Sequence, residues 1–127
     1  MVGIVLVSHS SDIASGLAQL AGQMAGDDVR IEAVGGGPGG GLGTSGDAVR
    51  AALERADAGD GVVVLGDLGS AILTVRHVLD RNGNGHVRLA DAPFVEGAVA
   101  AAVTASVGSS LDDVARAAEE ARGASKL

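Results

Sequence analysis

The stretch VGIVLVSHSSD, residues 2–12, joins a buried strand directly to the start of a helix. Residues 2–7 are apolar or glycine throughout, a pattern typical of a strand that is covered on both faces of a parallel sheet. Ser10, Ser11 and Asp12 follow, and these residue types are favoured at helix N-termini. A strand that leads at once into a helix is the repeating unit of α/β folds. His9 stands at the junction between the two.

The same alternation continues along the chain. Residues 29–34 and the apolar run 62–65 predict two further strands, and residues 86–90 predict a short fourth strand, each separated from the next by a helical pattern. Two Ala-rich segments, 95–107 and 111–122, predict two consecutive helices at the end. The first helix has a predicted core-facing stripe of Ile13, Leu17, Leu20, Ala21 and Met24.

These elements predict an α/β fold with an open, mainly parallel sheet of about four strands and helices on both faces. The 127 residues fit one domain. We expect this domain to span residues 1–122 and a short flexible tail to occupy residues 123–127.

Composition excludes several classes of function. The chain has no cysteine, which excludes disulfides and thiolate chemistry. A net charge of −7, with no basic run and Phe94 as the single aromatic, argues against nucleic-acid binding. No apolar run approaches the ~20 residues of a membrane span. We therefore expect a soluble cytoplasmic domain that binds neither nucleic acid nor membrane and carries no cofactor.

The predicted sheet also nominates a functional site. Right-handed crossovers make all strands point the same way, and ligands of open α/β sheets bind beyond the carboxyl ends of the strands. Residues 8–12, 35–46, 66–71 and 91–96 lie at that edge. Of the three histidines, His9 is at this edge, whereas His77 falls within a helix and His86 at the opposite edge.

The expected surroundings of His9 favour chemistry on its ring. Asp67 ends the third strand as His9 ends the first, and a carboxylate beside a histidine fixes the tautomer and makes the other ring nitrogen more nucleophilic. Helix N-termini after Ser10 and Ser70 would offer free N–H groups to an anion. The loop GGGPGGGLGTSG, residues 35–46, adds further donors. An activated imidazole among anion-binding donors points to phosphohistidine chemistry.

Three other interpretations of this edge remain open. Gly41, Gly43 and Gly46 match the dinucleotide fingerprint G-x-G-x-x-G, with Asp67 about 20 residues further on. In that fingerprint, however, the first glycine ends the strand, whereas here residues 35–40 intervene. A metal site would have only carboxylates beside His9, and we predict none. A structural adaptor would use His9 merely as a satisfied polar group at a strand end.

Four motifs together resemble a known family. They are VLVSHSSDIASGLAQLAGQM (5–24), GGLGTSGDAV (40–49), VLGDLGSA (64–71) and APFVEGAVAAAV (92–103). In this order they resemble the phosphotransferase subunit of the bacterial PTS-dependent dihydroxyacetone kinase. The N-terminal domain of that subunit is of the mannose-type EIIA superfamily. The similarity extends from Val2 to about Arg122.

The resemblance implies a phosphotransferase activity and a homodimer. His9 would accept a phosphoryl group from phospho-HPr and pass it to ADP bound in the nucleotide-binding subunit of dihydroxyacetone kinase. Asp67 would orient His9 by pairing with Nδ1, which leaves Nε2 to be phosphorylated. The alternative within the superfamily is a mannose-type sugar EIIA phosphocarrier. The residues expected to bind phosphate are Ser10, Gly43, Thr44, Ser45, Gly69 and Ser70.

To dock the donor and the acceptor of the phosphoryl group, the protein also needs a surface around His9 that excludes water. Apolar residues in the carboxyl-edge loops are the candidates for this surface: Leu42, Leu68, Ile72 and Phe94.

Overall fold

The computed structural model describes residues 1–37, 43–82 and 85–127. Within these residues, four strands form one sheet: β1 (Gly3–Ser8), β2 (Ile31–Gly35), β3 (Val62–Gly66) and β4 (Val87–Leu89). The helices are α1 (Ser11–Ala25), α2 (Gly46–Ala56), α3 (Gly69–Asn82), α4 (Phe94–Ser106) and α5 (Leu111–Glu120), followed by the 3₁₀ turn η1 (Ala121–Gly123). All strand pairs are parallel, in the order β2-β1-β3-β4. The predicted fold class is therefore confirmed.

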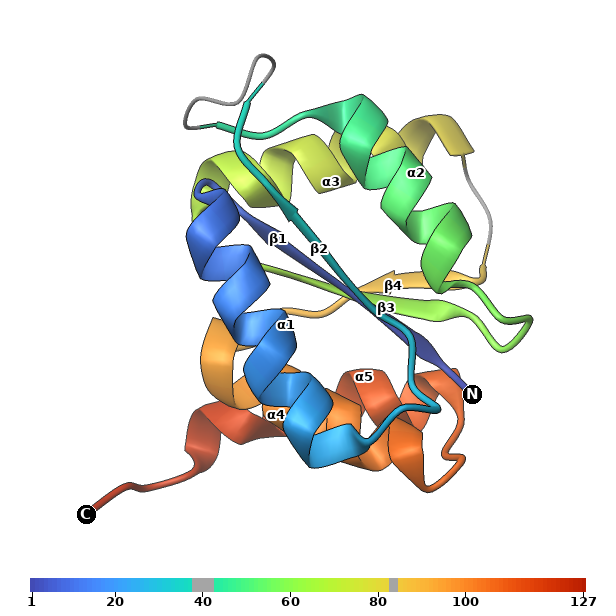
Figure 1. Ribbon diagram of the computed structural model, residues 1–127, viewed down its shortest axis with the longest axis vertical. Helices are drawn as coiled ribbons and strands as arrows, with labels where there is room; N and C mark the ends of the chain where they lie inside the picture. The colour runs from blue at the N-terminus through green and yellow to red at the C-terminus, as the bar shows by residue number, and fades with distance from the viewer. Residues whose placement is uncertain (38–42, 83–84) are drawn as a thin grey trace.

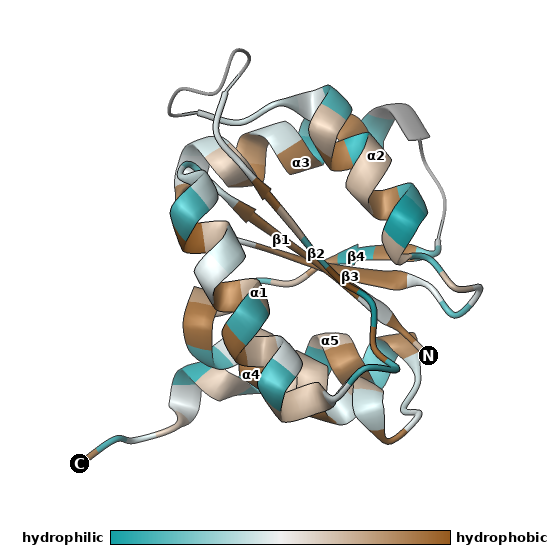
Figure 2. Cartoon of the chain, in the orientation of Figure 1, coloured by the Kyte–Doolittle hydropathy of each residue, from teal (hydrophilic) through white to brown (hydrophobic). Residues whose placement is uncertain are grey.

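The helices cover both faces of the sheet. Figure 1 shows α2 and α3 above the sheet and α1, α4 and α5 below it. Alternate residues of the central strands supply the two cores. In β1, Ile4 and Leu6 pack with α1, α4 and α5, whereas Val5 and Val7 pack with α2 and α3. This explains why the sequence of β1 is continuously apolar, and why the central strands β1 and β3 are largely brown in Figure 2.

Alanine lets the lower helices approach the sheet and each other closely. Ala98, Ala101, Ala102 and Ala105 of α4 are fully buried. With one Phe and no Tyr or Trp in the chain, small side chains and the branched residues of the strands make up this core. No helix within the described residues is long and apolar enough to traverse a lipid bilayer.

One predicted helix face is wrong in part. Leu17 and Ala21 of α1 are buried as expected, but Ile13, Leu20 and Met24 lie on the solvent side, with Met24 58% exposed. Ala14 takes the place of Ile13 in the core. The physical reason is close packing: α1 lies against β2 and α4 through small residues, so its larger apolar residues point outward.

A close approach fixes where α1 begins. A Cβ on Gly35, the last residue of β2, would come within 2.5 Å of the Ser11 Cα and 2.6 Å of the Ser10 carbonyl oxygen. Only glycine therefore allows the end of β2 to pass under the start of α1. This contact positions the segment that carries His9.

The end of the chain contacts α4. Lys126 Nζ lies 2.9 Å from Glu96 Oε2, and this ion pair is solvent-exposed. The hydrogen bond from Lys126 lowers the pKa of Glu96, with smaller contributions from the Glu96 main chain and from the lysine charge. The domain boundary after residue 122 falls within η1, and the flexibility of residues 123–127 stays a prediction.

Candidate functional site

His9 lies between the end of β1 and the N-cap of α1, at the carboxyl edge of the sheet. His9 is partly buried. The β1–β3 register pairs Val7 with Gly66, so the next residues along, Ser8 and Asp67, are brought side by side. The two strand ends that the sequence predicts to be adjacent do meet here.

The Asp67 carboxylate is a hydrogen-bond acceptor for three groups at these strand ends. It accepts from Ser8 Oγ at 2.6 Å, from the Leu68 amide at 2.7 Å and from the His9 amide at 3.3 Å. Ser8 is fully buried, and its oxygen also accepts from the Ser10 amide at 3.0 Å. Asp67 thus holds the main chain on both sides of the His9 ring.

The contact to the ring itself differs from the one implied by the family resemblance. Among the described residues, no hydrogen bond joins the Asp67 carboxylate to Nδ1 of His9; the Ser70 hydroxyl lies 3.3 Å from that nitrogen instead. The reason is geometric, because the short aspartate side chain reaches the adjacent main-chain amides first. Ser70, in the first turn of α3, then faces the ring.

This arrangement fits a histidine that reacts through Nε2. When Nδ1 carries the proton and donates to Ser70 Oγ, Nε2 keeps its lone pair. The hydroxyl can also donate to an unprotonated Nδ1, so the proton positions follow from the tautomer. The ring is half-buried, while Ser70 is exposed.

Two helix N-termini supply main-chain donors beside His9. In α1, the Ile13 amide donates to the Ser10 side chain at 3.4 Å, and the Ala14 amide donates to the Ser10 carbonyl. The Ser11 and Asp12 amides have no acceptor among the described residues. The Gly69 and Ser70 amides at the start of α3 are likewise available. Such amides, at the positive ends of helix dipoles, suit an anion.

The glycine-rich loop is tied directly to His9. The Gly43 amide donates to the His9 carbonyl at 2.9 Å, and Gly43 has a φ of 133°, which favours glycine. Thr44 Oγ1 is buried and has no hydrogen-bond partner among the described residues. Ser45 caps α2 by accepting from the Ala48 amide at 3.3 Å. A buried hydroxyl that lacks a partner in the described part of the chain is a candidate to bind a ligand.

Two residues of the predicted loop, Gly41 and Leu42, lie outside the described residues. The roles predicted for Ser10, Gly43, Thr44, Ser45, Gly69 and Ser70 in phosphate binding stay predictions. Of these residues, Ser70 contacts the His9 ring and Gly43 contacts the His9 main chain.

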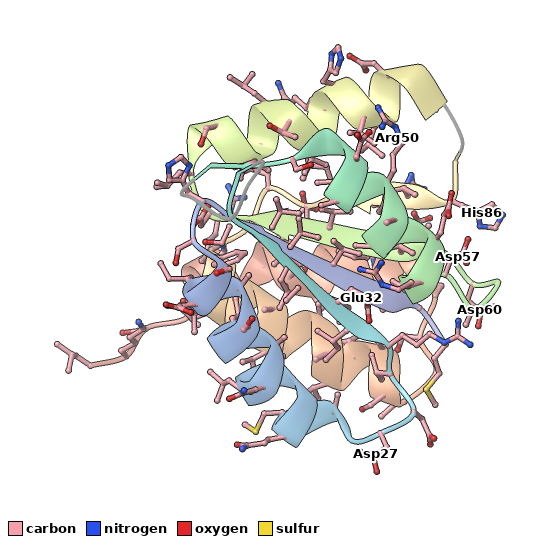
Figure 3. All side chains as sticks on the ribbon, turned by 45° about the horizontal axis from the view of Figure 1, so that its top comes forward. Asp27, Glu32, Arg50, Asp57, Asp60 and His86 are labelled. Atoms are coloured by element: carbon pink, nitrogen blue, oxygen red, sulfur yellow. The ribbon has the colours of Figure 1, made fainter. Side chains whose placement is uncertain are left out.

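The other two histidines lie away from this edge. His77 is exposed on α3. The His86 carbonyl accepts from the Val62 amide at the start of β3, and Figure 3 shows His86 near Asp57 and Asp60 at the opposite edge of the sheet. In the part of the chain that the structure describes, no group of three or more His, Asp or Glu residues is arranged to hold a metal ion.

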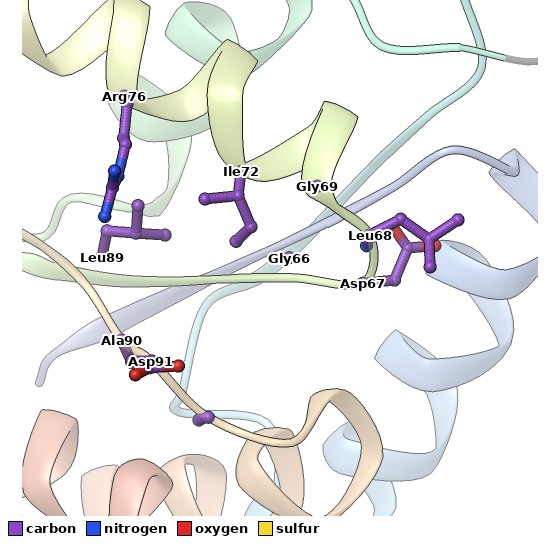
Figure 4. A pocket seen from close by; sticks show the side chains of 10 residues that line it. Gly66, Asp67, Leu68, Gly69, Ile72, Arg76, Leu89, Ala90 and Asp91 are labelled. Atoms are coloured by element: carbon purple, nitrogen blue, oxygen red, sulfur yellow. Dashed lines mark hydrogen bonds between the residues drawn. The ribbon is translucent and has the colours of Figure 1, made fainter.

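A cavity of about 290 Å³ adjoins the site on the β4 side (Figure 4). It runs from Asp67, Leu68 and Gly69 to the segment after β4, with Ile72 and Arg76 of α3 on one side. Leu68 and Ile72, both predicted to contact partners, line this cavity. Phe94 instead packs, half-buried, against the core below the sheet.

Two features of the site were missed in the sequence analysis. Ser8 is the buried partner of Asp67, and the signal was available: it is the single hydroxyl that ends an otherwise apolar strand. Arg76 left no comparable signal, because its relation to the site depends on how α3 packs against β4.

Comparison with known proteins identifies the family to which the chain is similar. The EIIA-man model, described as PTS system fructose IIA component, matches residues 3–115. A phosphoryl donor subunit DhaM of PEP-dependent dihydroxyacetone kinase 2 from Listeria innocua is 37% identical over 117 residues, covering 90% of this chain and 94% of that protein.

Longer relatives of the same kind also match. The phosphoryl donor subunit DhaM from Pantoea ananatis is 41% identical over 120 residues, which is 90% of this chain but 25% of the relative. The chain thus spans about a quarter of the length of such relatives. Among solved structures, a protein of unknown function, EF1359, superposes with a TM-score of 0.83 at 32% identity, covering 94% of this chain and 95% of that one.

Proposed function

The chain belongs to the EIIA-man family, among its DhaM-type members, and from this premise we propose that it is a cytoplasmic phosphohistidine carrier. In this role it is the phosphotransferase subunit of a phosphoenolpyruvate-dependent dihydroxyacetone kinase. The relatives are named as phosphoryl donor subunits of such kinases, which supports the assignment.

The observation that carries the proposal is the position of His9. Its ring stands at the carboxyl edge of the sheet with Nδ1 facing the Ser70 hydroxyl. A neutral imidazole is already a nucleophile near pH 7, so no separate general base is needed. The main chain around the ring is fixed through Asp67, which limits the orientations that the ring can adopt.

The donors around His9 would stabilise the transferred group. A phosphoryl group on Nε2 carries negative charge, and the free amides of Ser11, Asp12 and Gly69 offer hydrogen bonds to its oxygens. Thr44 Oγ1 is the one buried side-chain polar atom without a partner among the described residues, and a phosphoryl oxygen would satisfy it. We assign Ser10, Gly43, Ser45 and Ser70 to the same pocket.

The proposed cycle has two transfers. In the first, Nε2 of His9 attacks the phosphorus of phospho-HPr; the N–P bond to the donor histidine breaks, and its electron pair returns to that imidazole. In the second, a β-phosphate oxygen of ADP in the nucleotide-binding kinase subunit attacks phospho-His9. The new O–P bond completes ATP, and the His9 lone pair is restored.

A second candidate shares the first transfer but differs in the acceptor. The family model carries the description of a fructose IIA component, which keeps open a mannose-type sugar EIIA role. In that role the phosphoryl group would leave His9 for a sugar-specific PTS component rather than for ADP. Adding each acceptor to the phosphorylated protein distinguishes the two functions.

Incubation with phosphoenolpyruvate, enzyme I and HPr tests the proposal directly. We expect one phosphate per chain, labile in acid and stable in base, on His9. The His9→Gln variant should take up none, while His77→Gln, on an exposed part of α3, should behave as wild type. Phosphate found on His77 or His86, or none on the wild-type protein, would refute the proposal.

The homodimer implied by the family resemblance also remains a proposal. Sedimentation equilibrium of the purified chain measures it. A single species of monomer mass at micromolar concentration would contradict it.

A further inference from the structure

The solvent side of α1 and α4 carries large apolar side chains that stay exposed. In α1, Ile13, Leu20 and Met24 are between 42% and 58% exposed, and they recur at the spacing of one helix face. In α4, every fourth residue from Val95 to the C-cap, Val107, is a valine that is exposed or half-buried. Single apolar residues are ordinary on a surface, but a group of them on neighbouring helices is typical of an interaction site.

The two rows of apolar residues lie on adjoining sides of the two helices. Figure 1 shows α1 and α4 side by side below the sheet, and the two helices are in contact. One flank of α1, with Ala18 and Gly22, lines a groove toward β2. Ile13, Leu20 and Met24 project from the other side of the helix, toward α4. We call the outer surface formed by the two rows the α1/α4 face: Ile13, Leu20, Met24, Val95, Val99, Val103 and Val107.

This face is almost free of charge. α1 has 15 residues with Asp12 as its one charged side chain, and α4 has 13 residues with Glu96 as its own. Both carboxylates are in the first turn of their helix, and Glu96 pairs with Lys126. By contrast α5, on the same side of the sheet, has five charged side chains in 10 residues. The solvent face of an ordinary surface helix is charged as α5 is, whereas the centre of a protein interface is depleted in charge.

We propose that the α1/α4 face binds the same face of a second copy of this chain around a two-fold axis. In such a contact each patch meets its own copy, so a patch with a net charge would repel its partner. Each copy carries a net charge of −7, and two copies can approach closely only where that charge is absent. The inference rests on the homodimer proposed above and adds the surface through which the two copies meet.

The chemistry of the face disfavours other occupants. Neither helix sequence contains Lys or Arg, which amphipathic helices use to bind anionic membranes. A phosphoryl donor or acceptor must reach His9 at the carboxyl edge, whereas Met24 and Val107 lie at the far ends of their helices. A dimer through the α1/α4 face therefore leaves the carboxyl edge of each copy open to the proteins that exchange the phosphoryl group with His9.

Two helices side by side provide the area of a small interface. At 1.5 Å per residue α1 is about 22 Å long, and two helices of about 10 Å diameter span roughly 20 Å. Side chains raise the accessible area of such a face above its flat area, toward the ~800 Å² per partner of standard interfaces. The contact has to use most of both helices, so a charge placed on either helix should weaken it.

The test places one negative charge on the face and the same charge elsewhere. Leu20→Glu and Val103→Glu alter the α1/α4 face, while Leu73→Glu makes the same change on α3, across the sheet, where Leu73 is 67% exposed. Sedimentation equilibrium measures the monomer–dimer dissociation constant of each whole chain. We expect Leu73→Glu to match wild type, and the two face variants to raise the constant by about 100-fold or more. Because Leu20 and Val103 are 42% and 44% exposed, their variants should fold as monomers, which circular dichroism checks.

The absence of cysteine from the chain permits a second, positional test. Leu20→Cys places a thiol on the α1/α4 face, and Leu73→Cys places one outside it. We expect alkylation of the first thiol by a maleimide to slow as the protein concentration is raised through the dissociation constant. The rate constant for the second thiol should stay the same at every concentration. Equal behaviour of the two thiols would show that the dimer forms through another surface.

Three other results would overturn the proposal. The first is a wild-type chain that remains monomeric, and the second is a pair of face variants that dimerise as tightly as wild type. The third is a different occupant: face variants that stay dimeric but lose transfer from phospho-HPr, or wild-type binding to anionic lipid vesicles that Leu20→Glu abolishes. Phosphorylation is measured separately, and a chain that dimerises through this face but takes no phosphate from phospho-HPr refutes the proposed function instead.

Discussion

Ser8 and Asp67 form the polar pair on which the geometry of His9 depends. The Ser8 hydroxyl is fully buried and donates to the Asp67 carboxylate at 2.6 Å. The same carboxylate accepts from the amides of His9 and Leu68. Three donors converge on two oxygens, so the carboxylate acts on the His9 main chain, and the ring contact is left to Ser70.

Asp67→Asn should therefore destabilise the fold as well as the site. An amide has one acceptor oxygen in place of two, so at least one of the three donors is left facing an N–H group. We expect the free energy of unfolding to fall by about 1–3 kcal/mol in chemical denaturation. Asp27→Asn, at an exposed residue beyond α1, is the control and should leave stability unchanged. Equal stability of the two variants would contradict the structural role of Asp67.

Ser70→Ala should change the His9 ring without unfolding the protein. Removing the hydroxyl leaves Nδ1 without its partner, so the preference for the tautomer with the proton on Nδ1 should weaken. A neutral hydrogen bond contributes about 0.5–1.5 kcal/mol, which corresponds to a roughly 2- to 10-fold slower transfer from phospho-HPr.

The ring ¹⁵N chemical shifts of His9 report the tautomer directly. Ser70→Thr keeps the hydroxyl and should restore both the shifts and the rate. Unchanged shifts in Ser70→Ala would show that the 3.3 Å contact does not orient the ring.

The start of α1 is held by its contact with the end of β2. Ser10 caps the helix, and Gly35 passes beneath Ser10 and Ser11 at a distance that admits no side chain. The helix thereby begins at a fixed point beyond β1, with its free amides next to His9. On the opposite side of the site, the first turn of α3 brings Ser70 to the ring.

Gly35→Ala should disturb this junction. Its Cβ would lie 2.5–2.7 Å from main-chain atoms of Ser10 and Ser11, so the helix start must shift. We expect a loss of about 1–3 kcal/mol in stability, together with slower phosphorylation of His9.

Gly16→Ala is the matched control for this prediction. A Cβ there meets nothing within 4 Å, and alanine in a helix interior is favoured over glycine by about 0.5–1 kcal/mol. Denaturant midpoints should thus move in opposite directions for the two variants. If both midpoints moved in the same direction, the contact of Gly35 with Ser10 and Ser11 would not be what restricts residue 35 to glycine.

All strands of the sheet end at one edge, and the net charge of −7 acts on every partner that approaches that edge. In a parallel sheet the loops after β1, β2 and β3 meet there, which is why residues from three distant parts of the chain surround His9. The ions of the solvent screen the long-range attraction to a basic partner but leave the short-range contacts at the site in place.

Transfer from phospho-HPr should consequently slow as salt rises. At about 0.1 M ionic strength the screening length is near 10 Å, so exposed charges beyond that distance stop contributing. We expect the stopped-flow second-order rate constant to fall steadily between low and high salt, while the denaturation midpoint shows that the fold is retained. A rate that does not respond to salt would exclude electrostatic steering.

The sequence by itself determined the order of strands and helices, the parallel sheet and the position of His9 at its carboxyl edge. It could do so because continuous apolar strands, alternating with helices, leave few topologies, and right-handed crossovers fix the polarity. The adjacency of His9 and Asp67 follows from the same reasoning, since both directly follow central strands.

Only the tertiary structure decided which groups touch. Ser70 rather than Asp67 faces Nδ1, α1 turns Ile13 and Met24 to solvent, and Arg76 lines a cavity beside the site. Each of these depends on how closely two elements pack, and a difference of one or two ångströms changes the partner. Periodicity specifies which side of an element is apolar, but the choice of hydrogen-bond partner is made by the distances between side chains of separate elements.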